Sequence, residues 1–384
     1  MNVLVSATRQ PFAVDEVRKL GRAGHRVIAL DSFAAAPGSH SRYVSRPVTT
    51  AGPRLEPARF LEDVLRVVAE EKIDLVLPTF EEAFYLARQA RAFPISCELF
   101  TSPFETLLLL HDKSSFNGLV RSLGLSAPRS TTVTSRGALL DALATFPRYV
   151  ARPIYSRGAT RLLTNEGPLA GLIDVESCEP TEALPWIVQD WIDGEDVCTF
   201  SVARHGHVTA HVSYVHPVEL EHGSGIVIES VDAPDTLAPV RDIVKSVGYH
   251  GQLSCDFRRS RDGALHLLES NPRACNGVCL MPDDVFLDAV LSREVGPTRV
   301  IQAGQKRTVA LAVLRCAFRE PRTAARALRY LFARDTRDVF ADPRDLWPAI
   351  YQLLTYGQVL RYRRWAGPRR VRRTELIEAY GYDF

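Results

Sequence analysis

The chain has 384 residues, of which 46% are hydrophobic and 24% are charged, a composition typical of a globular protein with room for two or three domains. Its net charge of +2 hides an asymmetry, because residues 301–384 carry +9 and leave −7 for residues 1–300. The seven cysteines lack paired CxxC spacing, which argues against a disulfide framework or a zinc site. No apolar run reaches about 18 residues and the N-terminus lacks a signal-peptide pattern, so we predict a cytoplasmic protein without a membrane span.

Residues 1–108 alternate short apolar strands with amphipathic helices, a pattern that predicts a parallel α/β domain. The segment after the first strand lacks the Gly-rich turn of a dinucleotide fold, which argues against NAD. Asp31 ends the second strand, where a ribose-binding acid or an ordinary turn residue would both fit. Because the carboxyl ends of parallel strands form ligand crevices, Arg9, Thr79 and Glu82 are candidates for holding a substrate or contacting the next domain.

Residues 251–277 contain two apolar-rich runs separated by Asp262-Gly263, a strong signal for a two-residue hairpin turn. Counting outward from such a turn places Asp256 directly opposite Glu269. Two carboxylates this close repel each other unless a cation lies between them.

Asn271 falls on the same face as Glu269, because it lies two residues further along the strand. Asp256, Glu269 and Asn271 therefore form an all-oxygen ligand set that suits Mg²⁺ bound to nucleotide phosphates. Arg273 follows on that side, and its guanidinium could bind phosphate or carboxylate oxygens in a bidentate manner. The alternative is an ordinary exposed hairpin, in which acidic residues are common.

The hairpin motifs, Asp256-Phe257 and the run from Glu269 to Arg273, resemble the D-F and E-x-N-P-R metal signature of ATP-grasp enzymes. Three further segments occur in that family's order, and four ordered matches are more specific than any one. The further segments are His111 to Lys113, Tyr149 to Pro153 followed by Ser156 to Gly158, and Val188 to Asp196. The resemblance covers residues from about 110 to 300.

The resemblance implies an α/β protein with the ATP-grasp fold. We expect an N-terminal parallel α/β domain at 1–108 and an ATP-grasp domain at 109–300, with a small α+β lid at about 127–188 and an antiparallel-sheet base. A basic, mainly helical C-terminal region would occupy 301–384.

The resemblance also implies the nucleotide-binding residues. They are Lys113, Arg152, Ser156, Gly158, Gln189, Asp190, Trp191, Ile192 and Asp196. Lys113 and Arg152 would bind phosphates, the loop with Ser156 and Gly158 would cover them, and Asp196 would bind the ribose. Arg152 departs from the family's usual lysine, which keeps the charge but changes the reach and geometry. For Trp191 in the adenine hinge, a role as simple core filler stays an alternative.

Residues 216–228 look like a Gly-containing polar loop facing the acceptor site, with plain solvation as the alternative. Beyond residue 300 we predict a strand at 308–314 and helices at 322–332 and 346–356. The run 361–373 holds seven arginines and no acid. Since it lacks the interleaved aromatic stacking pattern of RNA-binding sheets, we favour a solvated packing or homodimer face over a nucleic-acid or anionic membrane surface.

The resemblance to ATP-grasp enzymes implies an ATP-dependent ligase that activates a small carboxylate as an acyl phosphate and joins it to an amine, whereas the hairpin geometry by itself supports only a metal and phosphate site. ATP and one or two Mg²⁺ ions, with Mn²⁺ as a substitute, would be the cofactors. Arg152 and Arg273 would be the catalytic residues, Arg273 acting on the carboxylate and the developing acyl phosphate. The alternatives are a non-amine acceptor, a nucleotide-binding subunit without turnover, or nucleic-acid binding by the basic tail.

Overall fold

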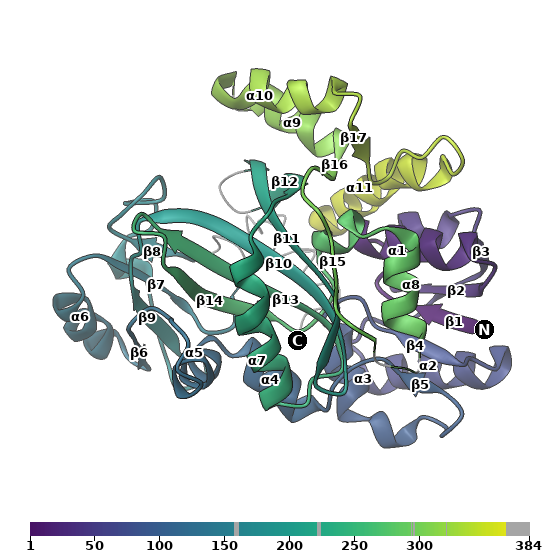
Figure 1. The fold of residues 1–384 in the computed structure, drawn as a ribbon, viewed down its shortest axis with the longest axis horizontal. Coiled ribbons are helices and arrows are strands. Elements are labelled where there is room, and N and C mark those ends of the chain that lie inside the picture. The colour runs from purple at the N-terminus through teal and green to yellow at the C-terminus, as the bar shows by residue number, and fades with distance from the viewer. Residues whose placement is uncertain (157–160, 221–223, 293, 295, 320, 366–384) are drawn as a thin grey trace.

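The computed structural model describes residues 1–156, 161–220, 224–292, 294, 296–319 and 321–365. Three β-sheets follow one another along the described chain, one parallel sheet of five strands and two further sheets of four and eight strands. Figure 1 shows the large sheet in the middle of the molecule, with the small sheet on one side and the parallel sheet on the other. The predicted α/β class is confirmed.

The first sheet has the strand order β3-β2-β1-β4-β5, and all of its pairings are parallel. Its strands are β1 (Asn2–Val5), β2 (Arg26–Asp31), β3 (Val44–Thr49), β4 (Leu75–Leu77) and β5 (Glu98–Leu99). The helices of this part are α1 (Pro11–Arg22), α2 (Pro57–Glu71), α3 (Glu82–Arg88), α4 (Phe104–His111) and the short η1 (Pro37–His40). The two edge strands escaped the sequence pattern, because β3 alternates partly buried and exposed positions with few apolar residues and β5 has only two residues.

The small sheet has the antiparallel order β6-β9-β7-β8. Its elements are β6 (Ser130–Val133), α6 (Arg136–Thr145), β7 (Tyr149–Pro153), β8 (Leu163–Thr164) and β9 (Trp186–Asp190). Helix α5 (Lys113–Ser122) leads into it, and the side chain of Asp112 caps that helix by accepting from the backbone N–H of Ser115 at 2.7 Å. The lid predicted at 127–188 therefore corresponds to a sheet of its own.

The large sheet has the order β14-β13-β10-β11-β12-β16-β17, with β15 paired to β11. Its strands are β10 (Gly194–Arg204), β11 (His207–Leu220), β12 (Ser224–Ser230), β13 (Gly251–Ser260), β14 (Leu265–Asn271), β15 (Arg299–Val300), β16 (Lys306–Thr308) and β17 (Thr336–Asp338). The associated helices are α7 (Leu237–Ser246), η5 (Asn276–Leu280) and α8 (Asp283–Leu291). The strand pairs from β14 through β16 along this path are antiparallel.

Two predictions for this sheet are wrong. Residues 216–220 belong to β11 and residues 224–228 to β12, so these parts of the predicted loop are paired strands, and residues 221–223 lie outside the described residues. Residues 308–314 form the end of β16 and the start of helix α9 (Ala310–Arg319) instead of a strand. A short apolar run such as this one has no period that separates a strand from a buried helix.

The C-terminal region also contains helices α10 (Pro321–Phe332), close to the predicted bounds, and α11 (Trp347–Trp365), which begins close to the predicted start but continues nine residues beyond the predicted end at 356. Most of the arginine-rich run 361–373 lies outside the described residues, and none of its side chains is described. In the described part of the chain, no helix combines the length and hydropathy needed to cross a bilayer.

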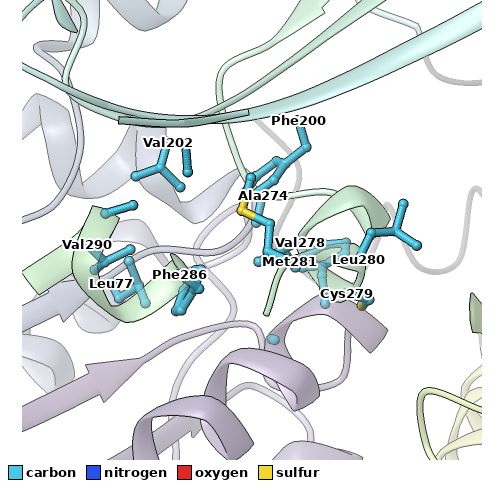
Figure 2. Close-up of a cluster of buried hydrophobic side chains, with 14 of the residues drawn as sticks. Leu77, Phe200, Val202, Ala274, Val278, Cys279, Leu280, Met281, Phe286 and Val290 are labelled. Carbon is cyan, nitrogen blue, oxygen red and sulfur yellow. The ribbon is translucent and has the colours of Figure 1, made fainter. Parts of the chain in front are cut away.

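A shared hydrophobic core joins the parallel sheet to the large sheet. Leu77 at the end of β4 lies in one cluster with Phe200 and Val202 of β10. Figure 2 shows side chains of η5 and α8, among them Leu280 and Phe286, together with Met281 from the link between these helices, in the cluster that contains these strands. Gly277 of η5 packs against Phe200 so closely that a Cβ added to this glycine would lie 2.4 Å from Cβ of Phe200. This packing fixes the parallel sheet against the large one.

Candidate active site

The β13–β14 hairpin pairs Asp256 with Glu269, as the sequence predicted, but its turn differs from the predicted one. Ser260 donates its backbone N–H to the carbonyl of Ala264 at 2.9 Å, so three residues form the loop, and Gly263 there has a φ of +89°. This turn shifts the pairing by one residue. An irregularity between Asp256 and the next position absorbs the shift, and the two carboxylates again face each other.

Two basic side chains converge on Glu269. Its carboxylate lies 2.9 Å from Nη1 of Arg152, at the end of β7, and 3.5 Å from Nζ of Lys113, at the start of α5. Asn271 lies 3.5 Å from the Asp256 carboxylate through its side-chain nitrogen. Four elements from two sheets and a helix therefore bring two carboxylates, an amide and two cations to one place.

The pKa values of this cluster diverge for physical reasons. Burial, together with the neighbouring Glu269 carboxylate, raises the pKa of Asp256. Burial acts in the same direction on Glu269, but the charges of Arg152 and Lys113 outweigh it and hold the pKa of Glu269 below its usual range. Burial lowers the pKa of Lys113 to about 8 although Glu269 opposes this shift. One carboxylate is thus neutralised by basic residues, and the other favours a bound cation or a proton.

Lys113 also contacts Ser156, in the segment that follows β7. The Lys113 ammonium donates to the backbone carbonyls of Ile154 at 3.1 Å and Ser156 at 2.8 Å. The Ser156 hydroxyl donates to the carbonyl of Pro153 at 2.8 Å. The predicted Gly158 lies outside the described residues.

Arg273 lies between the hairpin and the parallel-sheet domain. Its guanidinium donates to Oδ1 of Asn271 at 3.2 Å, lies 3.5 Å from the carboxylate of Glu81, and packs 4.6 Å from the ring centroid of Phe80. The loop after β4 therefore holds Arg273 next to the predicted metal ligands. Sequence analysis identified Arg273 but not the pairing with Glu81, which no local pattern could have shown.

A cavity of about 430 Å³ lies between the small sheet and the large sheet, beside this charged cluster. It is lined at one end by Arg152, Asp256 and Glu269. The predicted hinge residues Gln189, Asp190, Trp191 and Ile192 line it as well, together with Asp196. Val150, Leu162, Leu169, Phe257 and Leu268 supply apolar wall. A charged end and an apolar slot suit a ligand with a phosphate tail and an aromatic base.

The hinge residues differ in how their polar groups are satisfied. Gln189 is buried, and among the described residues its Nε2 has no hydrogen-bond partner. Asp190 forms a two-pronged ion pair with Arg129 at 3.0 and 3.1 Å, on the exposed side of β9. Trp191 donates its indole N–H to Asp193 at 2.9 Å. Trp191 therefore lies on the cavity wall in a fixed orientation, and Gln189 has an unused donor.

Arg258 is a cavity residue that sequence analysis missed. It donates to the backbone carbonyl of Ile192 at 2.8 Å and to the carboxylate of Asp196 at 2.7 Å, and its guanidinium lies 5.1 Å from the Trp191 ring centroid. Its position two residues after Asp256 on β13 places both side chains on one face, which was a usable signal. Asp196, predicted to bind a ribose, thus already has a basic partner.

The other end of the cavity is formed by the β11–β12 hairpin. His216, Glu219 and Gly225 line it, and Cys198 of β10 lies with its sulfur 4.0 Å from Nδ1 of His216. A Cβ on Gly225 would lie 2.0 Å from the His216 ring, so only glycine fits there. Burial lowers the pKa of His216 to about 4, which keeps this ring neutral near pH 7. The predicted acceptor segment therefore does contribute to the cavity through Glu219 and Gly225.

The candidates in the N-terminal domain are occupied by internal bonds. Glu82 accepts from the Ser6 hydroxyl at 2.6 Å and from the backbone N–H groups of Thr79 and Phe80 at 2.9 and 3.0 Å.

Arg9 pairs with Asp31 at 2.8 Å, and Asp31 also accepts from backbone N–H groups of Arg9 and Phe33 at 2.8 Å each. Both side chains are buried. These bonds give Arg9, Asp31, Thr79 and Glu82 structural roles.

Within the described residues, no group of three or more His, Cys, Asp or Glu side chains is arranged to hold a metal ion. The predicted set contains two carboxylates, Asp256 and Glu269, and the amide of Asn271. A magnesium ion there would take its remaining oxygen ligands from phosphate or water, which is the usual arrangement for Mg²⁺ beside nucleotides.

No family model matches the chain. Among curated proteins, the chain is 28% identical over 237 residues to the carbamoyl phosphate synthase large chain of Deinococcus deserti. That alignment covers 58% of this chain and 23% of the relative, so the chain spans about a quarter of the relative's length.

Solved structures share the fold at low sequence identity. The ADP complex of N5-carboxyaminoimidazole synthetase from Staphylococcus aureus has a TM-score of 0.57 at 13% identity, covering 77% of this chain and 78% of that one. The L-amino acid ligase from Bacillus licheniformis has a TM-score of 0.52 at 18% identity, covering 72% and 68%. The biotin carboxylase domain dimer of Hydrogenobacter thermophilus 2-oxoglutarate carboxylase, solved with MgADP and bicarbonate, has a TM-score of 0.60 at 12% identity, covering 79% and 73%.

These likenesses show the fold. The chain has the ATP-grasp fold, as the four motifs predicted.

Proposed function

We propose that this protein is an ATP-dependent ligase that activates a small carboxylate as an acyl phosphate and joins it to an amine. The observation that carries the proposal is the convergence of Asp256 and Glu269 with Lys113 and Arg152 at one end of a 430 Å³ cavity whose remaining lining includes an apolar wall. Such a cavity offers phosphate-binding cations, oxygen ligands for a metal, and a slot for a base.

The charged cluster suits a metal-bound triphosphate. Asp256, Glu269 and Asn271 would hold one or two Mg²⁺ ions, since their oxygens are the hard ligands that Mg²⁺ prefers. The raised pKa of Asp256 indicates an anion that lacks a compensating cation, which is the environment a metal would relieve. Bound there, Mg²⁺ would neutralise charge on the transferred phosphoryl group.

The two basic residues beside Glu269 would divide their contacts between that carboxylate and the phosphates. Arg152 lies on the cavity wall and Lys113 lies behind Glu269, tied to the backbone after β7. Phosphoryl transfer depends on positioning and charge stabilisation, which such groups supply. The Gln189 amide, with its unused donor in the hinge, is suited to contact the adenine edge.

Arg273 would orient the carboxylate that attacks the γ-phosphorus. In this step a carboxylate oxygen bonds to phosphorus and ADP leaves with its electron pair. Arg273 already lies beside Asn271 and is held by Glu81, so its position is fixed relative to the proposed metal ligands. An amine nitrogen then attacks the acyl carbon, loses a proton and expels phosphate. His216 and Glu219 at the far end of the cavity are candidates for contacting these substrates.

The proposal is tested by ADP and phosphate release from ATP and Mg²⁺ with pools of amino acids and small carboxylates. An active pool member, ¹⁸O-labelled in its carboxylate, should transfer the label to the released phosphate, which reports an acyl phosphate. Glu269→Gln should abolish release. A matched control is Glu195→Gln, because Glu195 is an exposed carboxylate on the same sheet.

The possible outcomes of this assay distinguish the proposed ligase from the alternative functions. Labelled phosphate together with a new amide establishes the ligase, whereas labelled phosphate without an amide indicates a different acceptor. Unlabelled phosphate would mean that the phosphorylated group is not the carboxylate. Nucleotide binding without release from any pool would favour a binding subunit, and absent nucleotide binding would contradict the proposal.

A further inference from the structure

Helices α9 and α10 form a pair that stands on the edge of the large sheet. Figure 1 shows this pair projecting from the molecule beyond β12 and β16. Its inner side is apolar and buried, with Val313, Cys316 and Ala327 packed against Val218 and Val227 of β11 and β12. The pair is therefore anchored to the fold through one side, and its other side faces solvent.

The outer side exposes large apolar residues. Phe318 is 87% exposed and Phe332 is 79% exposed, although both are side chains that folding normally buries. Leu314 lies one helical turn before Phe318, on the same side of α9, and is also exposed. Exposed apolar groups that cluster on one element mark an interaction surface.

The same helix pair is strongly basic. Residues 309–334 contain six arginines and one acid, Glu320. Arg326 and Arg329 are exposed on α10, and Phe332 follows Arg329 by one turn. Arginine can lay its stem along an apolar surface while its guanidinium stays in water. The helix pair therefore exposes both apolar and cationic groups to solvent.

We propose that the α9–α10 pair docks onto an anionic phospholipid surface, with Phe318 and Phe332 entering the interface and the arginines contacting lipid phosphates. Amphipathic helices with a basic polar side and aromatic residues bind membrane surfaces in this way without crossing them. A second copy of the chain fits less well, because it would bring two arginine-rich faces together. Nucleic acid would use the arginines but leaves the exposed phenylalanines without a role.

Docking would bring the lipid surface close to the cavity wall. The sulfur of Cys316 on α9 lies 4.0 Å from the backbone carbonyl of Glu219, and Glu219 lines the cavity. The docking pair is thus in direct contact with the hairpin that forms one end of the candidate active site. The proposal itself rests on the surface of the helix pair and is independent of the catalytic proposal.

The test uses the full chain and sedimentation with lipid vesicles, without nucleotide. One set of vesicles contains phosphatidylcholine alone, and the other contains about one third phosphatidylglycerol to supply negative charge. We expect binding to the anionic vesicles that weakens as salt rises, since exposed charges are screened.

Two double variants probe the two parts of the surface. Phe318→Ser with Phe332→Ser removes the apolar part, and we expect at least a ~10-fold loss of vesicle affinity. Arg326→Glu with Arg329→Glu reverses two charges, and the loss should exceed roughly 25-fold, about fivefold for each arginine. The matched controls are Ile95→Ser and Arg91→Glu, exposed residues of the N-terminal part of the chain, which should leave binding unchanged.

Because the substituted side chains are exposed, the variants should keep the thermal unfolding temperature of the parent chain. Equal binding to both vesicle types, or none, would overturn the proposal. Binding that is insensitive to the phenylalanine substitutions but is competed by RNA would identify a polyanion surface instead. A sedimentation-velocity dimer that the phenylalanine variant dissociates would show that this face joins two copies of the chain.

Discussion

Polar residues gather in two regions of this protein, and only one of the two regions has the properties of a binding site. At the carboxyl ends of the parallel sheet, Glu82 accepts three hydrogen bonds from its own neighbourhood, and Arg9 pairs with Asp31. On the large sheet, Asp256 and Glu269 face each other beside a cavity and meet basic side chains from distant elements.

The difference lies in where the hydrogen-bond partners come from. In the first region, Asp31 and one carboxylate oxygen of Glu82 accept hydrogen bonds from backbone N–H groups, a hydroxyl and a neighbouring arginine, which makes both acids part of the framework. The other Glu82 oxygen, Oε2, is buried and has no hydrogen-bond partner among the described residues. In the second region, two acids share one small space and line an open cavity, so charge is left to be balanced by a ligand. The residue types are the same in both regions. The source of their hydrogen-bond and ion-pair partners distinguishes the candidate site from the framework.

The largest effect should follow from removing the Glu269 charge. Glu269→Gln keeps the shape but leaves Arg152 and Lys113 without their carboxylate and removes a proposed metal ligand. We expect MgATP-dependent turnover to fall on the order of 10³-fold. Stabilisation by MgATP in thermal unfolding should also be lost, and this readout requires no carboxylate substrate. Full stabilisation of the variant by MgATP would contradict the assignment.

A substitution in the parallel-sheet region should lower the stability of the fold and leave nucleotide binding unchanged. Asp31→Asn leaves the buried guanidinium of Arg9 without a counter-charge, so we expect a loss of about 3 kcal/mol in the free energy of unfolding. Urea titration measures this loss, with the exposed Asp141→Asn as the control. Nucleotide binding by the folded variant should be unchanged. Loss of nucleotide binding at intact stability would instead place this region in the site.

Arg152 allows a test of the departure from the family's usual lysine. Arg152→Ala removes a cation from the cavity wall, and we expect kcat/KM for ATP to fall roughly 100-fold. Arg152→Lys keeps the charge and should retain activity within about tenfold. If the lysine variant is as impaired as the alanine variant, the forked geometry of arginine is what the site requires.

A smaller, pH-dependent effect is expected at Glu16 of α1. This side chain is buried, and burial raises the pKa of its carboxyl well above the usual range. Its side-chain oxygens have no hydrogen-bond partner among the described residues. The folded protein therefore keeps this proton at pH values where the unfolded chain has lost it, and folding weakens as pH rises through the folded pKa.

Glu16→Gln should remove this dependence. We expect the variant to be more stable than the parent chain by about 1 kcal/mol at pH 7, and the gain should shrink toward pH 4. Thermal unfolding across this pH range gives the measurement. A gain that grows as pH falls would show that Glu16 is ionised and paired in the folded protein.

Sequence patterns predicted much of this architecture because they are local. Alternation of strands and helices gave the parallel sheet, and the run from Glu269 to Arg273 with Asp256 gave the proposed ligand set on one face of a hairpin. The pairing of these two acids was predicted although the turn was not, because a three-residue turn and a compensating irregularity restored the register. Edge strands β3 and β5 escaped detection since they are too short or too polar for a periodic signal.

Tertiary structure decided the rest. The sequence alone determined which residues are acidic, basic or apolar and which share the face of one strand or helix, because these properties repeat along the chain. It could not determine that Arg152 and Lys113 meet Glu269 or that Arg258 pairs with Asp196. Nor could it determine that Arg9 and Glu82 form their bonds within the N-terminal domain. Each of these facts depends on side chains from separate elements, and only packing of the three sheets brings them within hydrogen-bonding distance.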